Sequence, residues 1–229
     1  MEDCYLKKPV VYTEAAYLLG LLILAVGTAF TEYGDLGISM VVAPAYLVHL
    51  KLGISFGTAE YLLQGLILVC MMLVLRKVRL SYLFSFVTAV LYGLFLDGAM
   101  VLTASLPGDH MGLRIGFYIL GVLLGSAAIS LLFRTYLPPA AYEMFVKQIA
   151  RKFHKPIPVV KTVYDCTSLV VSIGISFLFF GQLRGVGIAT VICAFLNGWL
   201  IKLFTDLFGK CFTFQDRFSL RNRFEESEE

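Results

Sequence analysis

Long apolar stretches alternate with short polar connections along most of the chain. Six of these stretches hold about 20 residues, the length at which a helix crosses the ~30 Å hydrocarbon core of a bilayer. Two shorter segments, 38–50 and 139–153, are broken by Pro44 or carry several charged side chains, so we expect neither to span. The pattern predicts an all-α, polytopic membrane protein with six transmembrane helices. Its expected spans are 12–31, 56–75, 80–102, 112–133, 158–180 and 186–208.

The order of motifs in the first half of the chain recurs in the second half. The matching pairs are LGLLILAVG and LGVLLGSAA, ISFGTAEYL and IPVVKTVYD, and TAVLYGLFLD and CAFLNGWLIK. Three matches in the same order predict a duplication within a single membrane domain, with repeats over about 12–103 and 112–208 and a cytosolic tail over 209–229. Each repeat holds three spans and one short segment. Because three is odd, we expect the second repeat to be inverted relative to the first.

Composition excludes an ordinary water-soluble domain. The chain is 59% hydrophobic and only 15% charged, which leaves too few polar groups to cover a surface that faces water. Six spans with the N-terminus inside place most Lys and Arg, including those at 76–79, on the cytoplasmic side. Lys51, Arg114 and Arg184 alone remain outside. We therefore expect a multi-pass protein of the cell membrane with both termini cytoplasmic and the lipid bilayer as its surroundings.

The two short segments are each preceded by a sharp break in the chain. The first break is the glycine-rich sequence YGDLGIS at 33–39, and the second is LPP at 137–139. Irregular backbone near membrane depth is buried in protein or lines a wet cavity, so paired breaks indicate a binding site between the repeats. An amphipathic helix on each membrane face is the alternative, and the basic, Phe- and Ile-rich second segment fits it.

Polar residues within the spans are the candidates for a substrate site, because such groups are costly in lipid and usually face a partner or a cavity. Glu60 and Gln64 lie four residues apart and share a helix face, as do Lys161 and Asp165. Both pairs are candidate substrate-binding residues. Helix-to-helix hydrogen bonding is the competing account of the first pair, and a structural ion pair is that of the second.

Aromatic and amide side chains extend the candidate site. Tyr92 and Asn197 occupy corresponding positions in the two repeats, and Trp199, the one tryptophan, follows closely. Tyr61 and Tyr164 correspond in the same way. A lining of this kind suits a small planar or cationic ligand, although large aromatic residues also fill the core of a helical bundle.

Glycines in the spans point to close helix packing. Gly93 and Gly198 are expected to let helices approach closely, and the GxxxG sequence from Gly121 to Gly125 predicts packing within the bundle or in a homo-oligomer.

Patterns typical of enzymes and of cofactor or nucleic-acid binding are missing from the sequence. We find no phosphate-cradling loop, no Ser, His and Asp arrangement and no paired catalytic carboxylates at suitable spacing. The five cysteines form no CxxC pair, and the three histidines are scattered. We therefore expect no enzymatic activity, no metal, no cofactor and no nucleic-acid partner.

Several short motifs resemble those of the bacterial YczE/YitT-type integral membrane proteins. They are LGLLILAVGTAF, DLGIS, ISFGTAEYL and RGVGIATVICAFLNGWLIKLF, over 19–204. In that family an Arg and an acidic residue four positions later mark the second half, and Lys161 and Asp165 stand at those places here. Residues 139–143 depart from its Pro-aromatic-Asp pattern. The resemblance implies a protein of the bacterial inner membrane that transports something small.

Three functions are consistent with these features. The first is a small-molecule secondary transporter or permease that rocks two inverted repeats around a site at the membrane midplane. The second is the substrate-binding membrane subunit of a multi-component uptake system. The third is a membrane protein without transport activity that docks a lipid or a protein partner through the basic segment 144–154.

Overall fold

The computed structural model describes residues 9–106, 110–138 and 140–217. In these ranges the chain forms eight helices and two short strands. Six helices are long and apolar enough to cross a membrane, which confirms the expected number of spans. They are α1 (Thr13–Gly34), α3 (Phe56–Leu75), α4 (Leu80–Thr103), α5 (Met111–Leu132), α7 (Ile157–Phe180) and α8 (Ile188–Cys211).

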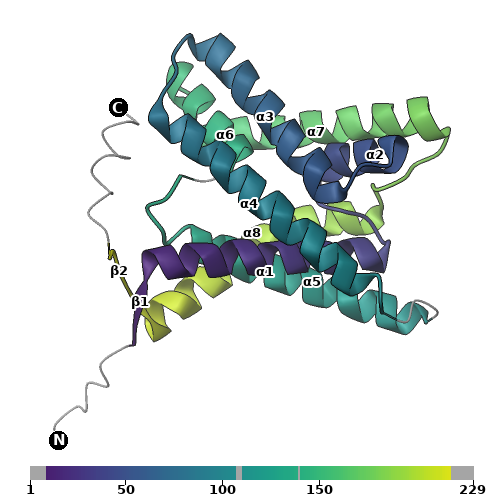
Figure 1. Ribbon diagram of the computed structural model, residues 1–229, viewed down its shortest axis with the longest axis horizontal. Coiled ribbons are helices and arrows are strands. Elements are labelled where there is room, and N and C mark those ends of the chain that lie inside the picture. The colour runs from purple at the N-terminus through teal and green to yellow at the C-terminus, as the bar shows by residue number, and fades with distance from the viewer. Residues whose placement is uncertain (1–8, 107–109, 139, 218–229) are drawn as a thin grey trace, which may run out of the picture.

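Two short helices, α2 (Ala43–Leu52) and α6 (Ala141–Lys152), complete the helical set. The order long, short, long, long therefore occurs twice along the chain. Figure 1 shows α2 and α6 at opposite ends of the bundle. The expected span at 56–75 coincides with α3, and the other expected ends differ from the observed ones by less than one helical turn. Pro139 of the second break and residues 218–229 of the expected tail lie outside the described residues.

Local chemistry explains several helix ends. The Oγ of Ser55 accepts a hydrogen bond from the Thr58 N–H at 3.2 Å, so α3 begins with a capped turn. Pro44 lies in the first turn of α2, where its missing N–H costs nothing. Gly53 follows α2 and Gly181 follows α7 in the left-handed conformation that ends a helix without strain.

The centre of the bundle is the long contact between α1 and α5. A Cβ atom at Gly27 would lie 2.9 Å from the Gly121 carbonyl oxygen, and one at Gly121 would lie 2.6 Å from the Gly27 oxygen. Gly121, the first glycine of the GxxxG sequence, thus packs against Gly27 inside the bundle, where the missing side chains let two backbones meet, whereas the Cβ position of Gly125 is open. Around this pair, α4 packs on α1, and α8 packs on α5.

The two halves differ at one helix pair. In the first half α3 packs on α4, and a Cβ atom at Gly57 would lie only 1.9 Å from the Gly93 oxygen. In the second half α7 and α8 do not pack along their lengths. The expectation that Gly198 also serves close packing is wrong, because nothing lies within 4 Å of the Cβ position there. Val160, the counterpart of Gly57, carries a branched side chain that would keep two backbones apart.

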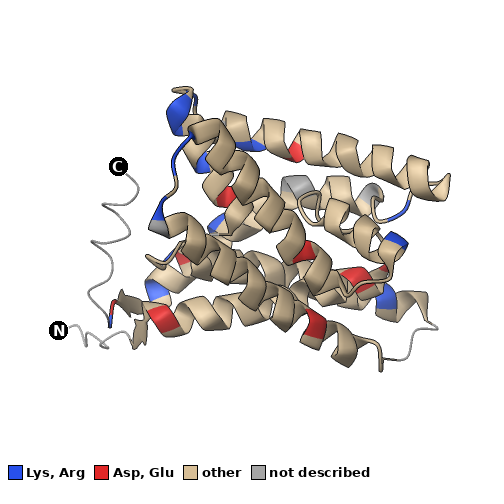
Figure 2. Cartoon of the chain, turned by 45° about the horizontal axis from the view of Figure 1, so that its top comes forward, with Lys and Arg blue, Asp and Glu red and all other residues tan. Residues whose placement is uncertain are grey.

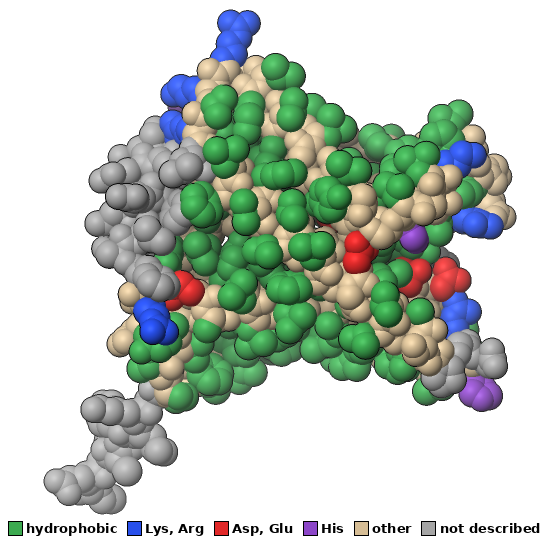
Figure 3. Space-filling model, viewed as in Figure 1, with side chains coloured by type: hydrophobic (Ala, Val, Ile, Leu, Met, Phe, Trp, Pro, Cys, Tyr) green, Lys and Arg blue, Asp and Glu red, His purple; other side chains and the backbone are tan. Residues whose placement is uncertain are grey.

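The surface of the bundle matches a membrane environment. Hydrophobic side chains cover most of the face seen in Figure 3, and Lys and Arg gather toward the two ends of the bundle in Figure 2. Strand β1 (Val10–Tyr12) pairs in parallel with β2 (Thr213–Gln215), so the chain enters and leaves the bundle on the same side. An even number of spans requires that arrangement. The start of the expected tail instead continues α8 and forms β2.

Candidate functional site

A cavity of about 320 Å³ lies inside the bundle, within the size range of small-molecule sites. Its lining comes from all six long helices, from α6 and from the connections that precede α2 and α6. Several side chains that the sequence singles out for a substrate site lie in this lining. They are Glu60, Gln64, Tyr92, Lys161, Asp165 and Asn197.

Glu60 and Gln64 form the centre of the α3 wall. The Glu60 side chain is 2% exposed, and its Oε1 accepts a hydrogen bond from Gln64 Nε2 at 3.0 Å. The second carboxyl oxygen, Oε2, is buried and has no hydrogen-bond partner. The Oε1 of Gln64 accepts a hydrogen bond from the Ala141 N–H, also at 3.0 Å, at the first residue of α6. Helix-to-helix bonding and a cavity position, the two interpretations of this pair, therefore occur together.

The backbone before α6 also reaches the interior of the bundle. The Thr88 hydroxyl on α4 donates to the Pro138 carbonyl oxygen at 3.4 Å, next to the bond from Ala141 to Gln64. Polar backbone groups outside a helix need such partners wherever water is excluded. Gln64 and Thr88 together hold the start of α6 against the middle of α3 and α4.

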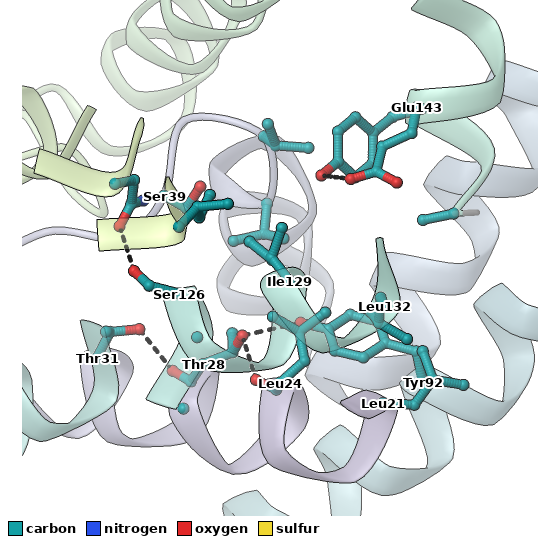
Figure 4. A pocket seen from close by; sticks show the side chains of 18 of the residues that line it. Leu21, Leu24, Thr28, Thr31, Ser39, Tyr92, Ser126, Ile129, Leu132 and Glu143 are labelled. Carbon is teal, nitrogen blue, oxygen red and sulfur yellow. Dashed lines mark hydrogen bonds between the residues drawn. The ribbon is translucent and has the colours of Figure 1, made fainter. Parts of the chain in front are cut away.

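Tyrosine and threonine pairs line the side of the cavity between α1 and α4. The hydroxyl of Tyr17 hydrogen-bonds to Thr88. The hydroxyls of Thr28 and Tyr92 lie 2.9 Å apart, and Thr28 also donates to the Leu24 carbonyl, as Figure 4 shows. These pairs satisfy the tyrosine hydroxyls inside the protein. Position 17 is missed by sequence reasoning, because nothing in the sequence tells which face of α1 turns inward.

The side between α5 and α8 is polar as well. Ser126 donates to Asn197 Oδ1 at 3.2 Å, which joins the two helices across the cavity wall. The Tyr118 hydroxyl lies 3.3 Å from the Cys193 sulfur. The Asn197 amide, which the sequence predicts as a site residue, therefore has a hydrogen-bond partner on α5. A lone serine in an apolar helix provided no signal for it.

Charged residues meet where α6 faces α7. The Tyr142 hydroxyl donates to Glu143 Oε1 at 2.8 Å (Figure 4). Lys161 Nζ lies 3.7 Å from Asp165 Oδ2, and it sits 5.6 Å from the centre of the Tyr142 ring. Burial raises the pKa of the Glu143 carboxyl, while the hydrogen bond from Tyr142 and the charge of Lys161 lower it. Burial and the neighbouring Glu143 together raise the pKa of the Tyr142 phenol.

Three further candidates lie outside the cavity lining. Tyr61 contacts the α3–α4 crossing, where its Cδ1 would be 3.1 Å from a Cβ at Gly93. Tyr164 packs behind the wall, with its ring centre 6.1 Å from that of Tyr142. Trp199 is 63% exposed on the outer surface of α8. Spacing along a helix locates aromatic residues in a span without telling which face turns inward.

The end of the bundle that carries α2 is closed by a contact between the halves. The Ile38 N–H donates to the Gly185 carbonyl at 2.9 Å. A Cβ at Gly187 would lie 2.2 Å from the Leu36 oxygen, and one at Gly37 would lie 2.4 Å from the Thr190 hydroxyl. Two glycines therefore let the α1–α2 connection press against the start of α8. Within the described ranges no three His, Cys, Asp or Glu side chains are grouped so as to hold a metal ion.

These features define a multi-pass α-helical membrane protein whose helical bundle encloses a largely apolar cavity with several polar side chains in its lining. The model of DUF6198, a family of unknown function, matches residues 11–206, and the chain belongs to that family. Comparison with curated proteins and with solved structures found no match. The narrower resemblance to YczE/YitT-type proteins stays a prediction.

Proposed function

We propose that this protein is a secondary transporter that carries a small molecule through the cavity between its two halves. The observation that carries the proposal is the buried Glu60 carboxyl, whose Oε2 lacks a partner and which lines a cavity among membrane-spanning helices. Polar groups are costly within a membrane, and they usually mark a substrate or ion pathway. A purely structural bundle has no need of such a group.

The packing supports two inverted repeats. Helix α1 meets its counterpart α5 along the centre, and the pairs α1 with α4 and α5 with α8 correspond. Helix α2 packs on α3 and α7, and its counterpart α6 packs on α7 and α3. Since α2 and α6 also lie at opposite ends, a two-fold axis in the membrane plane relates the halves in this proposal.

The position of α6 supports its partial re-entry into the membrane. Its first residue, Ala141, bonds to Gln64, which lies roughly 16 Å from the end of α3 at about 1.5 Å of rise per residue. That depth is about half of a ~30 Å hydrocarbon core. Helix α6 also packs on three helices, α3, α4 and α7, instead of resting on one face. A short helix in this place brings backbone groups to the substrate.

Alternating access requires parts that separate. The contact of Gly37 with Thr190 and Gly187 closes the end that carries α2, so we assign this conformation as closed there. The crossing of Gly57 and Gly93 ties α3 to α4, whereas α7 and α8 lack such a tie. We therefore assign the movement to α7 and α8, which shift against the tighter first half.

The first experiment measures ligand binding and then transport. Purified protein in detergent is melted in the presence of vitamins, amino acids, nucleobases and organic cations, because a ligand at about 100 times its dissociation constant adds ~2.7 kcal/mol of stability. A compound that shifts the melting temperature is then tested for uptake into proteoliposomes. We expect Gln64→Leu to abolish both signals. Gln148→Leu is the matched control, because Gln148 is also buried on a helix but does not line the cavity.

The outcomes separate the possible functions. Saturable binding followed by uptake supports a transporter. Binding without uptake by the isolated protein refutes it and favours a subunit of a multi-component uptake system. Docking of a lipid or protein partner is favoured if no compound shifts the melting temperature and if charge reversal at Arg151 and Lys152 abolishes the cellular function.

A further inference from the structure

We infer that the cavity binds a small organic cation and that a proton competes with this cation for the Glu60 carboxyl. The inference rests on the proposed function only where it concerns transport, because binding is measured on the isolated protein. It names the substrate class of the cavity, and it adds an exchange of a proton for the cation.

The first argument is the balance of charges. Three carboxyl groups, those of Glu60, Glu143 and Asp165, belong to the described lining. The one Lys, Arg or His side chain in the same lining is that of Lys161. Its Nζ lies 3.7 Å from Asp165 and its side chain is 51% exposed, so its charge is shared with a carboxylate and with solvent. Since the charge of Lys161 also acts on Glu143, Glu60 is the carboxyl group of the described lining that has no basic partner.

The second argument is the isolation of Glu60. The Tyr92 phenol approaches it from α4, and the Tyr164 phenol does so from α7. Glu143 and Tyr142 on α6, with Lys161 and Asp165 on α7, line the same cavity. On α2 the titratable groups Tyr46 and His49 interact instead with Glu32.

None of these groups places a positive charge on Oε2 of Glu60, which has no hydrogen-bond partner. An unpaired carboxylate in a site with little water is very costly. The carboxyl must therefore be neutralised by a proton or by a bound cation, and the two exclude each other.

The third argument is the aromatic character of the lining. The side chains of Tyr17, Tyr92, Tyr118 and Tyr142 all belong to it. Their hydroxyls are hydrogen-bonded to Thr88, Thr28, Cys193 and Glu143, respectively. Aromatic rings next to a carboxylate suit a cation with apolar substituents, such as an alkylammonium group, better than a hydrated metal ion. The cavity volume of about 320 Å³ fits a compound of that size.

Competition predicts a definite exchange. Binding of the cation releases the proton of Glu60, and binding of a proton releases the cation. When the two events occur on opposite sides of the membrane, one cation moves against one proton. Apparent affinity for the cation should therefore weaken up to tenfold for each pH unit below the point at which Glu60 takes up its proton.

The test compares choline with dimethylbutanol, its uncharged isostere in which carbon replaces nitrogen. Tetramethylammonium and guanidinium serve as further cationic probes. Calorimetry on the full chain in detergent measures binding at about pH 6 and about pH 8, on either side of neutrality. We expect at least one cation to bind saturably and more tightly at the higher pH, whereas dimethylbutanol does not bind.

Two matched variants locate the effect. Glu60→Gln retains the hydrogen-bonding shape of a protonated carboxyl, and we expect it to fold and to lose both cation binding and its pH dependence. Glu32→Gln makes the same chemical change at a carboxyl that accepts a hydrogen bond from Tyr46 at 3.3 Å and lies outside the cavity lining. This control should bind the cation as the wild type does.

The inference would be overturned if dimethylbutanol binds as tightly as choline, or if none of the three cations binds. It would also be overturned if cation binding does not depend on pH, or if cation binding survives Glu60→Gln. Should Glu60→Gln fail to fold, choline against dimethylbutanol in the wild type still decides the question. Cation binding without uptake in proteoliposomes keeps the cation site and removes the transporter. Uptake of an anion or a neutral solute without cation binding does the reverse.

Discussion

Replacement of Gly57 by alanine tests whether the crossing of α3 and α4 locks the first half of the bundle. The new Cβ would lie 1.9 Å from the Gly93 oxygen and 2.6 Å from its carbonyl carbon. Real Cβ atoms essentially never come closer than 3.0 Å to such atoms. Because both obstacles are backbone, α3 and α4 must separate by roughly 1 Å, and no side-chain rotation relieves the overlap.

The expected magnitude follows from two opposing terms. Overpacking of this kind costs about 1–3 kcal/mol or more, and alanine regains up to ~1 kcal/mol as the better helix former. We expect Gly57→Ala to lower the free energy of unfolding by about 2 kcal/mol. At roughly 2–4 °C per kcal/mol for a chain of this size, the melting temperature falls by ~4–8 °C.

Gly93→Ala and Gly198→Ala form a matched pair for the same test, because these residues correspond in the two halves. A Cβ at Gly93 would lie 2.7 Å from the Gly57 oxygen, whereas nothing lies within 4 Å at Gly198. We expect a loss of stability for the first variant and no loss for the second, measured by thermal unfolding in detergent with circular dichroism. Equal losses in the two, or a stable Gly57→Ala, would refute the reasoning.

Three further predictions concern single side chains. Asp97→Ala removes the acceptor of the Gly57 N–H at 2.7 Å and of the Ser55 hydroxyl at 2.6 Å, and should cost about 1 kcal/mol in thermal unfolding. In a double-mutant cycle, changing both Lys161 and Asp165 to Leu should be better tolerated than either single change, with a coupling below ~1 kcal/mol because the pair is partly exposed. Burial raises the pKa of Glu143, so its stabilising contribution is present at low pH and is lost as pH rises through the raised value. Glu143→Gln should therefore flatten the fall of melting temperature with pH, and an unchanged slope would contradict that assignment.

The spans were predictable because helix length and apolar character are local properties of the sequence. The expected segment at 56–75 is α3 to the residue. Packing between helices is not a local property. The sequence therefore predicts close helix packing at both Gly93 and Gly198, although of these two only Gly93 contacts another backbone. Whether a glycine lies at a crossing depends on the residue opposite to it, and Gly57 has no glycine at the corresponding position of the second half.

The candidate site was predictable only in part, for the same reason. Glu60 and Gln64 stand out in an apolar helix, and both line the cavity. Glu143 lies in a short amphipathic segment whose composition is typical of a surface helix. Its place in the cavity lining depends on the tertiary contact between Ala141 and Gln64, which no periodicity reveals. Trp199 shows the opposite case, since it is conspicuous in the sequence and exposed in the structure.

The difference in helix packing between the two halves follows from different residues at corresponding positions of the sequence. Asp97 caps the start of α3 and Gly57 admits α4, while Lys202 and Val160 stand at the matching places of the second half. A lysine cannot accept a hydrogen bond from a backbone N–H, and a valine keeps helices apart. The second half therefore lacks both the carboxylate cap and the close helix crossing of the first half.

The cavity residues divide in the same way. Glu60, Gln64 and Tyr92 belong to the tied helices, and Asp165 and Asn197 belong to the untied ones. A ligand that contacts residues of α3 and α4 and also residues of α7 and α8 stabilises one arrangement of these two helix pairs. For the transporter that we propose, occupancy of the cavity would thereby be linked to the position of α7 and α8, which is the linkage that alternating access demands.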